Sequence, residues 1–250
     1  MVKDSIVLVT GASRGIGRAC AKAFVEAGAR VILNGRDRVR LESLADVLSG
    51  ECYILPFDVR DRVKVEEAIA SLPENWAAID ILINNAGLSR GLDKVYEADF
   101  QDWEEMIDTN IKGLLYVTRQ IVPGMVERSK GHIINIGSTA GHQTYPGGNV
   151  YCGSKAAVKS ITEGLKQDLL GTPVRVSSVD PGLVETNFSN VRFHGDTERA
   201  SKVYQGLTPL TPEDVADVIL FCATRPAHVN LMDIVVMPVD QAPLMLFNRQ

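Results

Sequence analysis

Three glycines, at positions 11, 15 and 17, separate a short apolar stretch at residues 5–9 from a stretch with helical apolar spacing at residues 16–27. Glycine lets a backbone turn tightly and approach a ligand, and the first N–H groups of a helix are unpaired and partially positive. Strand, glycine loop and helix therefore predict a site for a dinucleotide pyrophosphate. Because the spacing is G-x-x-x-G-x-G and not the general G-x-G-x-x-G, a plain turn is the alternative.

A second group of polar residues could transfer a proton. Ser138 follows the apolar stretch 132–136, and Tyr151 and Lys155 stand four residues apart in the helical stretch 150–170, which puts both on one helix face. Such a pair is ordinary on a surface and defines no site alone. Asn110 is a polar residue on an otherwise apolar helix face predicted over 103–117. A buried amide needs hydrogen-bond partners, so Asn110 is either a core residue with all its hydrogen bonds made or a functional residue that binds backbone and water.

The end of the second predicted strand, residues 31–33, indicates which dinucleotide would bind. An acid at this place holds a ribose 2′-hydroxyl, whereas an arginine accepts a 2′-phosphate. Gly35 and Arg36 stand here, and Arg14 in the glycine loop offers a second cation, so the sequence predicts NADP(H). The alternative, given Asp37, is an exposed Arg-Asp-Arg turn without a ligand.

Two further strand ends carry polar residues. Asp58 follows the strand predicted at 53–55 and the stretch 57–59; it could accept a hydrogen bond from an adenine amino group or cap the helix predicted over 63–72. Asn84 and Asn85 follow the strand predicted at 79–83. Asparagines beside small residues can hold backbone where strands cross, which is a structural role as much as a binding one.

The elements that position these residues alternate along the whole chain. Further strands are predicted at 174–179 and 234–237, and a helix over 212–221. The stretch 187–206 is polar with scattered aromatic residues, and we interpret it as a lid over the substrate. Alternating strands and helices predict an α/β fold, a Rossmann-type doubly wound sheet of about seven parallel strands with helices on both faces. The 250 residues, 45% of them hydrophobic, are expected to form a single domain.

Composition excludes several function classes. A formal net charge of −5 and a pI near 5.4 give no electrostatic reason to expect nucleic acid or an anionic membrane as partner. The early first strand leaves no room for a signal peptide, and no apolar run approaches the roughly 18 residues of a membrane span. Four scattered cysteines, at 20, 52, 152 and 222, predict buried thiols in a reducing cytoplasm. No metal site is expected.

Taken together, the motifs resemble the short-chain dehydrogenase/reductase family over essentially the whole chain, including its glycine spacing. The matching stretches are T-G-A-S-R-G-I-G (10–17), N-N-A-G (84–87), Asn110, Ser138, Y-C-G-S-K (151–155) and P-G (181–182). The resemblance implies a homotetramer, for which the apolar tail 244–247 is a candidate surface. It also implies that the cofactor is bound by Gly11, Ser13, Arg14, Gly15, Ile16, Gly17, Arg36, Asp58, Val59, Asn85, Ala86, Gly87, Tyr151, Lys155, Pro181, Gly182, Val184 and Thr186.

The resemblance further implies four catalytic roles. Tyr151 would be the general acid in reduction and the general base in oxidation. Its free phenol has a pKa of about 10, which the ammonium of Lys155 and the oxidised nicotinamide would lower. Ser138 would hydrogen-bond the substrate oxygen. Asn110 would hold a helix irregularity and a water that links Lys155 to solvent.

A narrower likeness is to the NADP-dependent 3-hydroxy acid dehydrogenases, which include serine and allo-threonine dehydrogenases and reduce malonic semialdehyde. It is carried by stretches such as S-L-P-E-N-W (71–76), P-G-M-V-E-R (123–128), F-S-N-V-R-F (188–193) and P-A-H-V-N (226–230). Residues 13–16 and 142–144 depart from that group. Arg192, in the predicted lid, could bind a substrate carboxylate with two parallel hydrogen bonds, or it could be an exposed loop arginine. The alternatives are a 3-oxoacyl or generic ketone reductase and a non-enzymatic NADP-binding regulator.

Overall fold

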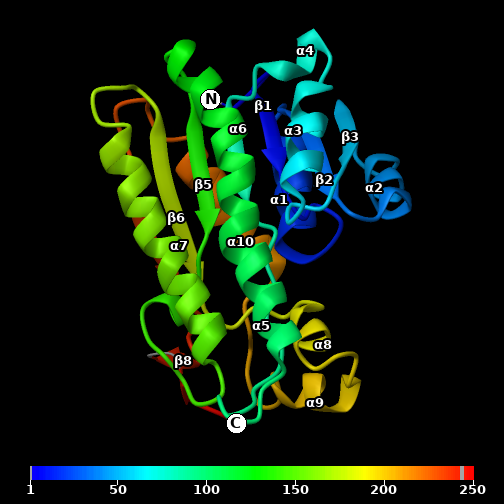
Figure 1. Ribbon diagram of the computed structural model, residues 1–250, viewed down its shortest axis with the longest axis vertical. Coiled ribbons are helices and arrows are strands. Elements are labelled where there is room, and N and C mark those ends of the chain that lie inside the picture. Colours follow the sequence, from blue (N-terminus) through cyan, green and yellow to red (C-terminus); the bar gives the residue numbers. More distant parts are fainter. Residues whose placement is uncertain (1, 243–244) are drawn as a thin grey trace.

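The computed structural model describes residues 2–242 and 245–250, and most of them build one parallel sheet between layers of helices (Figure 1). The sheet order is β3-β2-β1-β4-β5-β6-β7, and every neighbouring pair runs parallel. This confirms the predicted Rossmann-type sheet, although residues 57–59 lie beyond β3. The strands are β1 (Ile6–Val9), β2 (Arg30–Gly35), β3 (Cys52–Pro56), β4 (Ile81–Asn84), β5 (His132–Ile136), β6 (Arg175–Pro181) and β7 (Asp233–Val236).

Helices cover both faces of the sheet. One face packs against α1 (Gly15–Glu26), α2 (Arg38–Ala45) and α10 (Pro212–Ala223), and the other against α3 (Arg62–Ala70), α6 (Leu114–Glu127) and α7 (Asn149–Asp168). The short α4 (Glu74–Ala77) precedes β4. Near the C-terminus, β8 (Gln241–Ala242) and β9 (Leu246–Phe247) form an antiparallel pair. Residue 244 of the apolar tail lies outside the described residues; Met245 and Leu246 are exposed.

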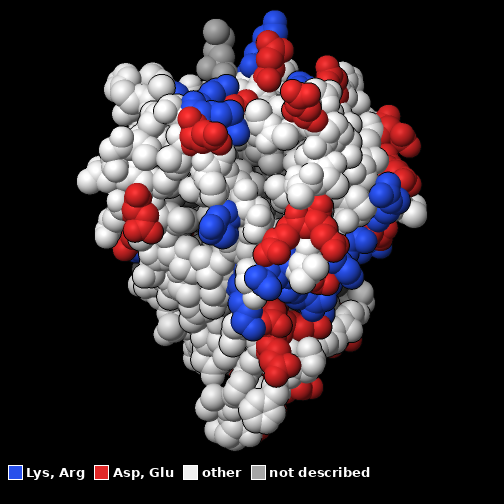
Figure 2. All heavy atoms as spheres, turned by 45° about the horizontal axis from the view of Figure 1, so that its top comes forward, with Lys and Arg blue, Asp and Glu red and all other residues white. Residues whose placement is uncertain are grey.

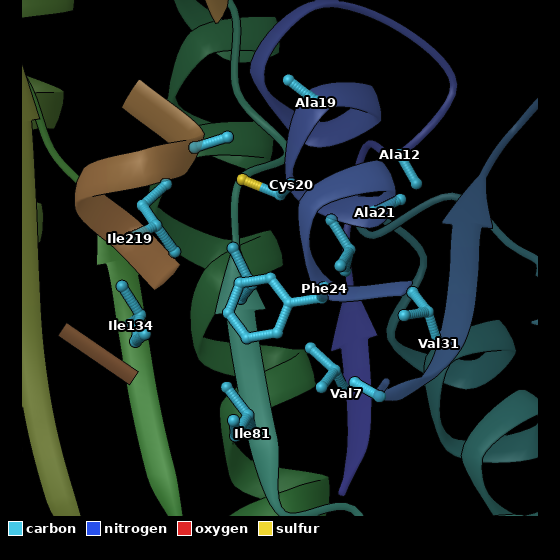
Figure 3. Close-up of a cluster of buried hydrophobic side chains, with 14 of the residues drawn as sticks. Val7, Ala12, Ala19, Cys20, Ala21, Phe24, Val31, Ile81, Ile134 and Ile219 are labelled. Carbon is cyan, nitrogen blue, oxygen red and sulfur yellow. The ribbon is translucent and has the colours of Figure 1, made fainter. Parts of the chain in front are cut away.

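The core explains why β1 is apolar without alternation. Val7 and Val9 belong to the cluster on the α1 and α10 face, whereas Ile6 and Leu8 belong to the cluster on the opposite face. Figure 3 shows Phe24 of α1 lying near Val7 of β1, Ile81 of β4 and Ile219 of α10. A strand buried on both faces must be apolar at every position, as the sequence predicted.

Two predicted segments differ in detail from the structure. The single helix predicted over 103–117 is α5 (Phe100–Ile107), a π-helical turn η1 (Asp108–Gly113) and α6. The lid at 187–206 contains two short helices, α8 (Phe188–Arg192) and α9 (Thr197–Lys202). Both lie with the C-terminal segment beyond the carboxyl ends of the strands (Figure 1).

The surface carries mixed charge. On the face drawn in Figure 2, described Lys and Arg side chains lie next to Asp and Glu side chains, so neither sign forms a continuous area there. Among the described helices, none has the length and apolar content to cross a bilayer. All four cysteines are free, and Cys52 is partly exposed, so the prediction of buried thiols is wrong for that residue.

Candidate active site

A cleft of about 690 Å³ opens at the carboxyl ends of the strands, between the glycine loop and the lid. It spans the end of β1, whose neighbours in the sheet are β2 on one side and β4 on the other. This reversal of strand order is the usual ligand position in a doubly wound sheet. Of the predicted site residues, Gly17 and Asn110 do not line the cleft. Those that line it are Gly11, Ser13, Arg14, Gly15, Ile16, Arg36, Asp58, Val59, Asn85, Ala86, Gly87, Ser138, Tyr151, Lys155, Pro181, Gly182, Val184, Thr186 and Arg192.

The glycine loop has the geometry that a phosphate cradle needs. Gly11 and Gly15 adopt φ values of +66° and +49°, which favour glycine. A Cβ at Gly17 would overlap the amide of Asn85. That amide donates to the carbonyl of Thr10 at 2.8 Å, so Asn85 holds the loop in shape. Since α1 has no side-chain cap, its first N–H groups remain available to an anion.

The end of β2 offers cations rather than an acid. Arg36 lines the cleft with 65% of its side chain exposed, and it forms an ion pair with Asp58 at 3.8 Å. Asp37, the acid nearest in sequence, accepts from the Arg40 N–H at 3.2 Å and thereby caps α2. Arg36 and Arg14 can therefore face an anion, as a 2′-phosphate requires.

Asp58 does not cap the helix that follows, which corrects one of its two predicted roles. Asp61 caps α3, whereas Asp58 accepts from Arg60 Nη2 at 2.7 Å. Burial raises the pKa of the Asp58 carboxyl, but the hydrogen bonds and charge of Arg60 outweigh it, and the net pKa is lowered. Asp58 thus presents an ionised acceptor to the cleft. Arg60 also lines the cleft, and no motif pointed to it.

Asn110 lies at the π-helical turn behind the cleft and is 2% exposed. Its amide accepts from the Leu88 N–H at 2.9 Å and donates to the Leu88 carbonyl at 2.8 Å and to Ser154 Oγ at 3.0 Å. A Cβ at Gly87 would lie 3.2 Å from Asn110 Oδ1 and 3.6 Å from Lys155 Nζ. Asn110 is therefore a satisfied buried amide, and Gly87 keeps the space between it and Lys155 clear.

Tyr151 and Lys155 both point into the cleft from α7. The Tyr151 hydroxyl hydrogen-bonds Ser138, while Lys155 Nζ donates to the Ile136 carbonyl at 2.8 Å. Burial raises the pKa of Tyr151, and the charge of Arg192 and the bond to Ser138 lower it in part. Burial lowers the pKa of Lys155 to about 8, against the opposing charge of Asp180. Arg192 is thus a cation whose charge lowers the pKa of the phenol.

Arg192, the last residue of α8, is held inside the cleft. Its Nε donates to Ser89 Oγ at 3.1 Å and its Nη2 to the Tyr145 hydroxyl at 3.0 Å. Its Cζ lies 5.3 Å from the centroid of the Tyr151 ring and 5.2 Å from that of Phe188. The alternative of an exposed loop arginine is therefore wrong. Sequence reasoning missed Ser89, Tyr145 and Phe188, for which no motif or spacing was a signal.

Comparison with known proteins agrees with this geometry. The chain is 53% identical to an NADP-dependent 3-hydroxy acid dehydrogenase, YdfG, of Salmonella typhi, over 95% of this chain and 96% of that protein. It is 43% identical to a serine 3-dehydrogenase of Rhizobium radiobacter, with 94% of each chain covered. Its fold matches a solved serine dehydrogenase in a closed form with NADP⁺ at a TM-score of 0.94 and 51% identity, over 98% and 99% of the two chains.

Residues 5–196 match the family model described as short chain dehydrogenase. This match covers more than half of the chain and includes the glycine loop, Ser138, Tyr151 and Lys155. The chain belongs to the short-chain dehydrogenase family.

Proposed function

We propose that this protein is an NADP-dependent oxidoreductase that interconverts a small 3-hydroxy acid, of the serine, allo-threonine or 3-hydroxypropionate class, and the corresponding 3-oxo acid or acidic aldehyde. The observation that carries the substrate class is the guanidinium of Arg192, held 5.3 Å from the Tyr151 ring inside the cleft. The planar guanidinium group can donate two parallel hydrogen bonds to a carboxylate. A small 3-hydroxy acid is short enough to reach both groups at once.

The cofactor is NADP(H), and the residues of the cleft fit it. The glycine loop and the first turn of α1 would hold its pyrophosphate, and Arg14 and Arg36 its 2′-phosphate, while Asp37, the acid that follows Arg36, caps α2. Asp58 offers an acceptor to an adenine amino group. When bound, NADP(H) supplies the hydride or takes it up.

The chain's own residues move the proton and orient the substrate. In reduction, Tyr151 donates its phenol proton to the substrate oxygen, and in oxidation its phenolate accepts that proton back. Ser138 hydrogen-bonds the same oxygen and holds the reacting carbon in place. The ammonium of Lys155 stabilises the phenolate. Asn110 fixes the π-helical turn that packs behind Lys155.

NADPH affinity tests the assignment of the 2′-phosphate site. Replacing Arg36 with glutamate is expected to raise the NADPH dissociation constant by about 10- to 100-fold, as the loss of one charge-assisted contact and the gain of repulsion require. NADH binding should not weaken, because an acid at this place can accept a hydrogen bond from the ribose 2′-hydroxyl. Arg38→Glu is the matched control, because Arg38 is on the same turn but does not line the cleft and pairs with Glu42 at 3.6 Å.

Fluorescence titration of both nicotinamides would measure these affinities. Unchanged NADPH affinity in Arg36→Glu, or equal use of NADH and NADPH by the unmodified enzyme, would contradict the assignment.

A substrate panel with both nicotinamide cofactors tests the function itself. We expect NADP⁺-dependent oxidation of L-serine, L-allo-threonine and 3-hydroxypropionate, and NADPH-dependent reduction of malonic semialdehyde. L-Serinamide, which lacks only the negative charge, should be oxidised with a far higher KM than L-serine. Faster reduction of a bulky 3-oxoacyl thioester than of malonic semialdehyde would instead favour a 3-oxoacyl reductase, and no turnover of any carbonyl would favour a binding protein.

We also propose a homotetramer in the cytoplasm. The tetramer is supported by the family, and the reducing compartment by four free cysteines. Sedimentation that finds only a monomer would refute the tetramer.

A further inference from the structure

A second cluster of ionisable side chains lies behind the cleft, at the end of β6. Its centre is Asp180, which directly precedes the predicted cofactor residues Pro181 and Gly182 and whose side chain is 1% exposed. His142 lies just after η2 (Thr139–Gly141), four residues beyond Ser138, and its side chain is 24% exposed. His142 is in the stretch that departs from the 3-hydroxy acid dehydrogenase pattern.

Every polar atom of this pair has a partner. The two oxygens of Asp180 are held by Ser178 Oγ and by His142 Nε2. The other ring nitrogen of His142, Nδ1, lies 3.3 Å from Lys159 Nζ. An ammonium can only donate and an ionised carboxylate can only accept. The imidazole therefore carries its hydrogen on Nε2, donates to Asp180 and accepts from Lys159.

The carboxylate is connected to the catalytic lysine through the β5 loop. A Cβ added at Gly137 would overlap Asp180 Oδ1, so the carboxylate lies against the backbone of that glycine. The preceding residue, Ile136, gives its carbonyl to Lys155 Nζ at 2.8 Å. The Asp180 charge also reaches Lys155 and raises its pKa, against the larger effect of burial.

Asp180 depends on its neighbours to stay ionised. Burial raises the pKa of its carboxyl above the usual value, and the nearby Asp233 adds to this, whereas the hydrogen bonds from Ser178 and His142 oppose the rise in part. Asp233 is itself paired with Lys159 at 3.6 Å. A buried carboxylate that loses a hydrogen-bond donor takes up a proton more readily.

We infer that His142 is a positioning residue for the reaction: by donating from Nε2, it keeps the buried Asp180 carboxylate ionised and in place, and this charge keeps the ammonium of Lys155 protonated. The inference rests on the proposed role of Lys155. Without the donor, Asp180 takes up a proton and no longer raises the pKa of Lys155, so Lys155 loses its own proton at a lower pH.

A divalent cation is the competing occupant of this cluster. His142, Asp180 and Asp233 each bring one ligand atom within 4.8 Å of the others. However, the ammonium of Lys159 already lies between the imidazole and Asp233, and its positive charge disfavours a metal ion. The cluster is therefore better explained as a hydrogen-bonded charge network.

The test measures the protonation of Lys155 directly in the cofactor-free protein. Labelling with acetic anhydride at pH 6 to 10, read by peptide mass spectrometry, gives the pH at which Lys155 becomes reactive. In His142→Ala this midpoint is expected to move to lower pH by about one unit. His142→Gln, which keeps an N–H donor, should stay near the wild type. His194→Ala is the matched control, since His194 pairs with Asp102 at 3.1 Å in another part of the chain.

Adding His142→Ala to Asp180→Asn should give no further shift, because both act through one carboxylate. The inference would be overturned if the Lys155 midpoint did not move in folded His142→Ala, or if His142→Gln shifted it as much as His142→Ala does. It would also be overturned if the wild-type midpoint changed when EDTA removed metal ions. The labelling does not require turnover, so it can fail or succeed independently of the proposed substrate.

Discussion

Replacing Tyr151 with phenylalanine is expected to lower kcat for aldehyde reduction by about 10³-fold, the usual contribution of a general acid, and to leave NADPH affinity unchanged. The change removes one oxygen atom from a ring that keeps its packing against Phe188, with 5.7 Å between the ring centroids. Burial raises the pKa of Tyr151, so at pH 7 the phenol is protonated and ready to donate. The ring alone cannot supply that proton.

Tyr145→Phe is the matched control for this experiment. Tyr145 also lines the cleft, and its hydroxyl accepts a hydrogen bond from Arg192 Nη2 at 3.0 Å. With a neutral aldehyde as substrate, Tyr145→Phe should keep most of its kcat, and stopped-flow measurement of NADPH oxidation would show the difference between the two variants. Tyr151→Phe with more than a tenth of the wild-type kcat would assign the acid to another group.

The sequence predicted the frame of the site well because its signals are local. The four apolar residues of β1, the glycine spacing and the alternation of strands and helices each depend on near neighbours in the chain. Since parallel strands present their carboxyl ends at one edge, Ser138 could be placed at that edge from the sequence, whereas the family resemblance brought Tyr151 to the site.

The errors arise where neighbouring residues compete or where distant ones meet. Asp58 and Asp61 both precede α3, and only the pairing of Arg60 with Asp58 decides that Asp61 is the cap. The periodicity around Asn110 singled out an odd polar residue, but without the family resemblance it did not show that the helix widens there.

Arg192 was the least predictable member of the site. The partners that turn it inward, Ser89 and Tyr145, lie 103 and 47 residues away in the chain. No local pattern encodes such contacts. The lid had to be seen folded as α8 before its arginine could be separated from an ordinary surface cation such as Arg199 on α9.

Replacing Arg192 with alanine is therefore expected to raise KM for malonic semialdehyde by about 10²- to 10³-fold, since the variant loses a bidentate, charge-assisted contact in a partly buried place. A neutral aldehyde of the same length should keep its KM within a few fold. The two aldehydes should be compared in the reduction reaction at pH 7. Arg192 lowers the pKa of Tyr151, so without it the phenol stays protonated at pH 7, and the comparison of KM between the acidic and the neutral aldehyde reports the substrate contact.

Arg199→Ala provides the control, because this arginine is on the neighbouring lid helix but stacks on Phe193, 4.4 Å from the ring centroid, and does not line the cleft. Its KM values should match those of the wild type for both aldehydes. If Arg192→Ala raised KM equally for the acidic and the neutral aldehyde, its guanidinium would be a support for the lid and not a carboxylate site. In that case Arg90, which also lines the cleft, would be a candidate cation for the substrate, but it is paired with Glu105 at 2.8 Å. A cation already paired in this way binds a second carboxylate weakly, and this is the physical reason to assign the substrate to Arg192.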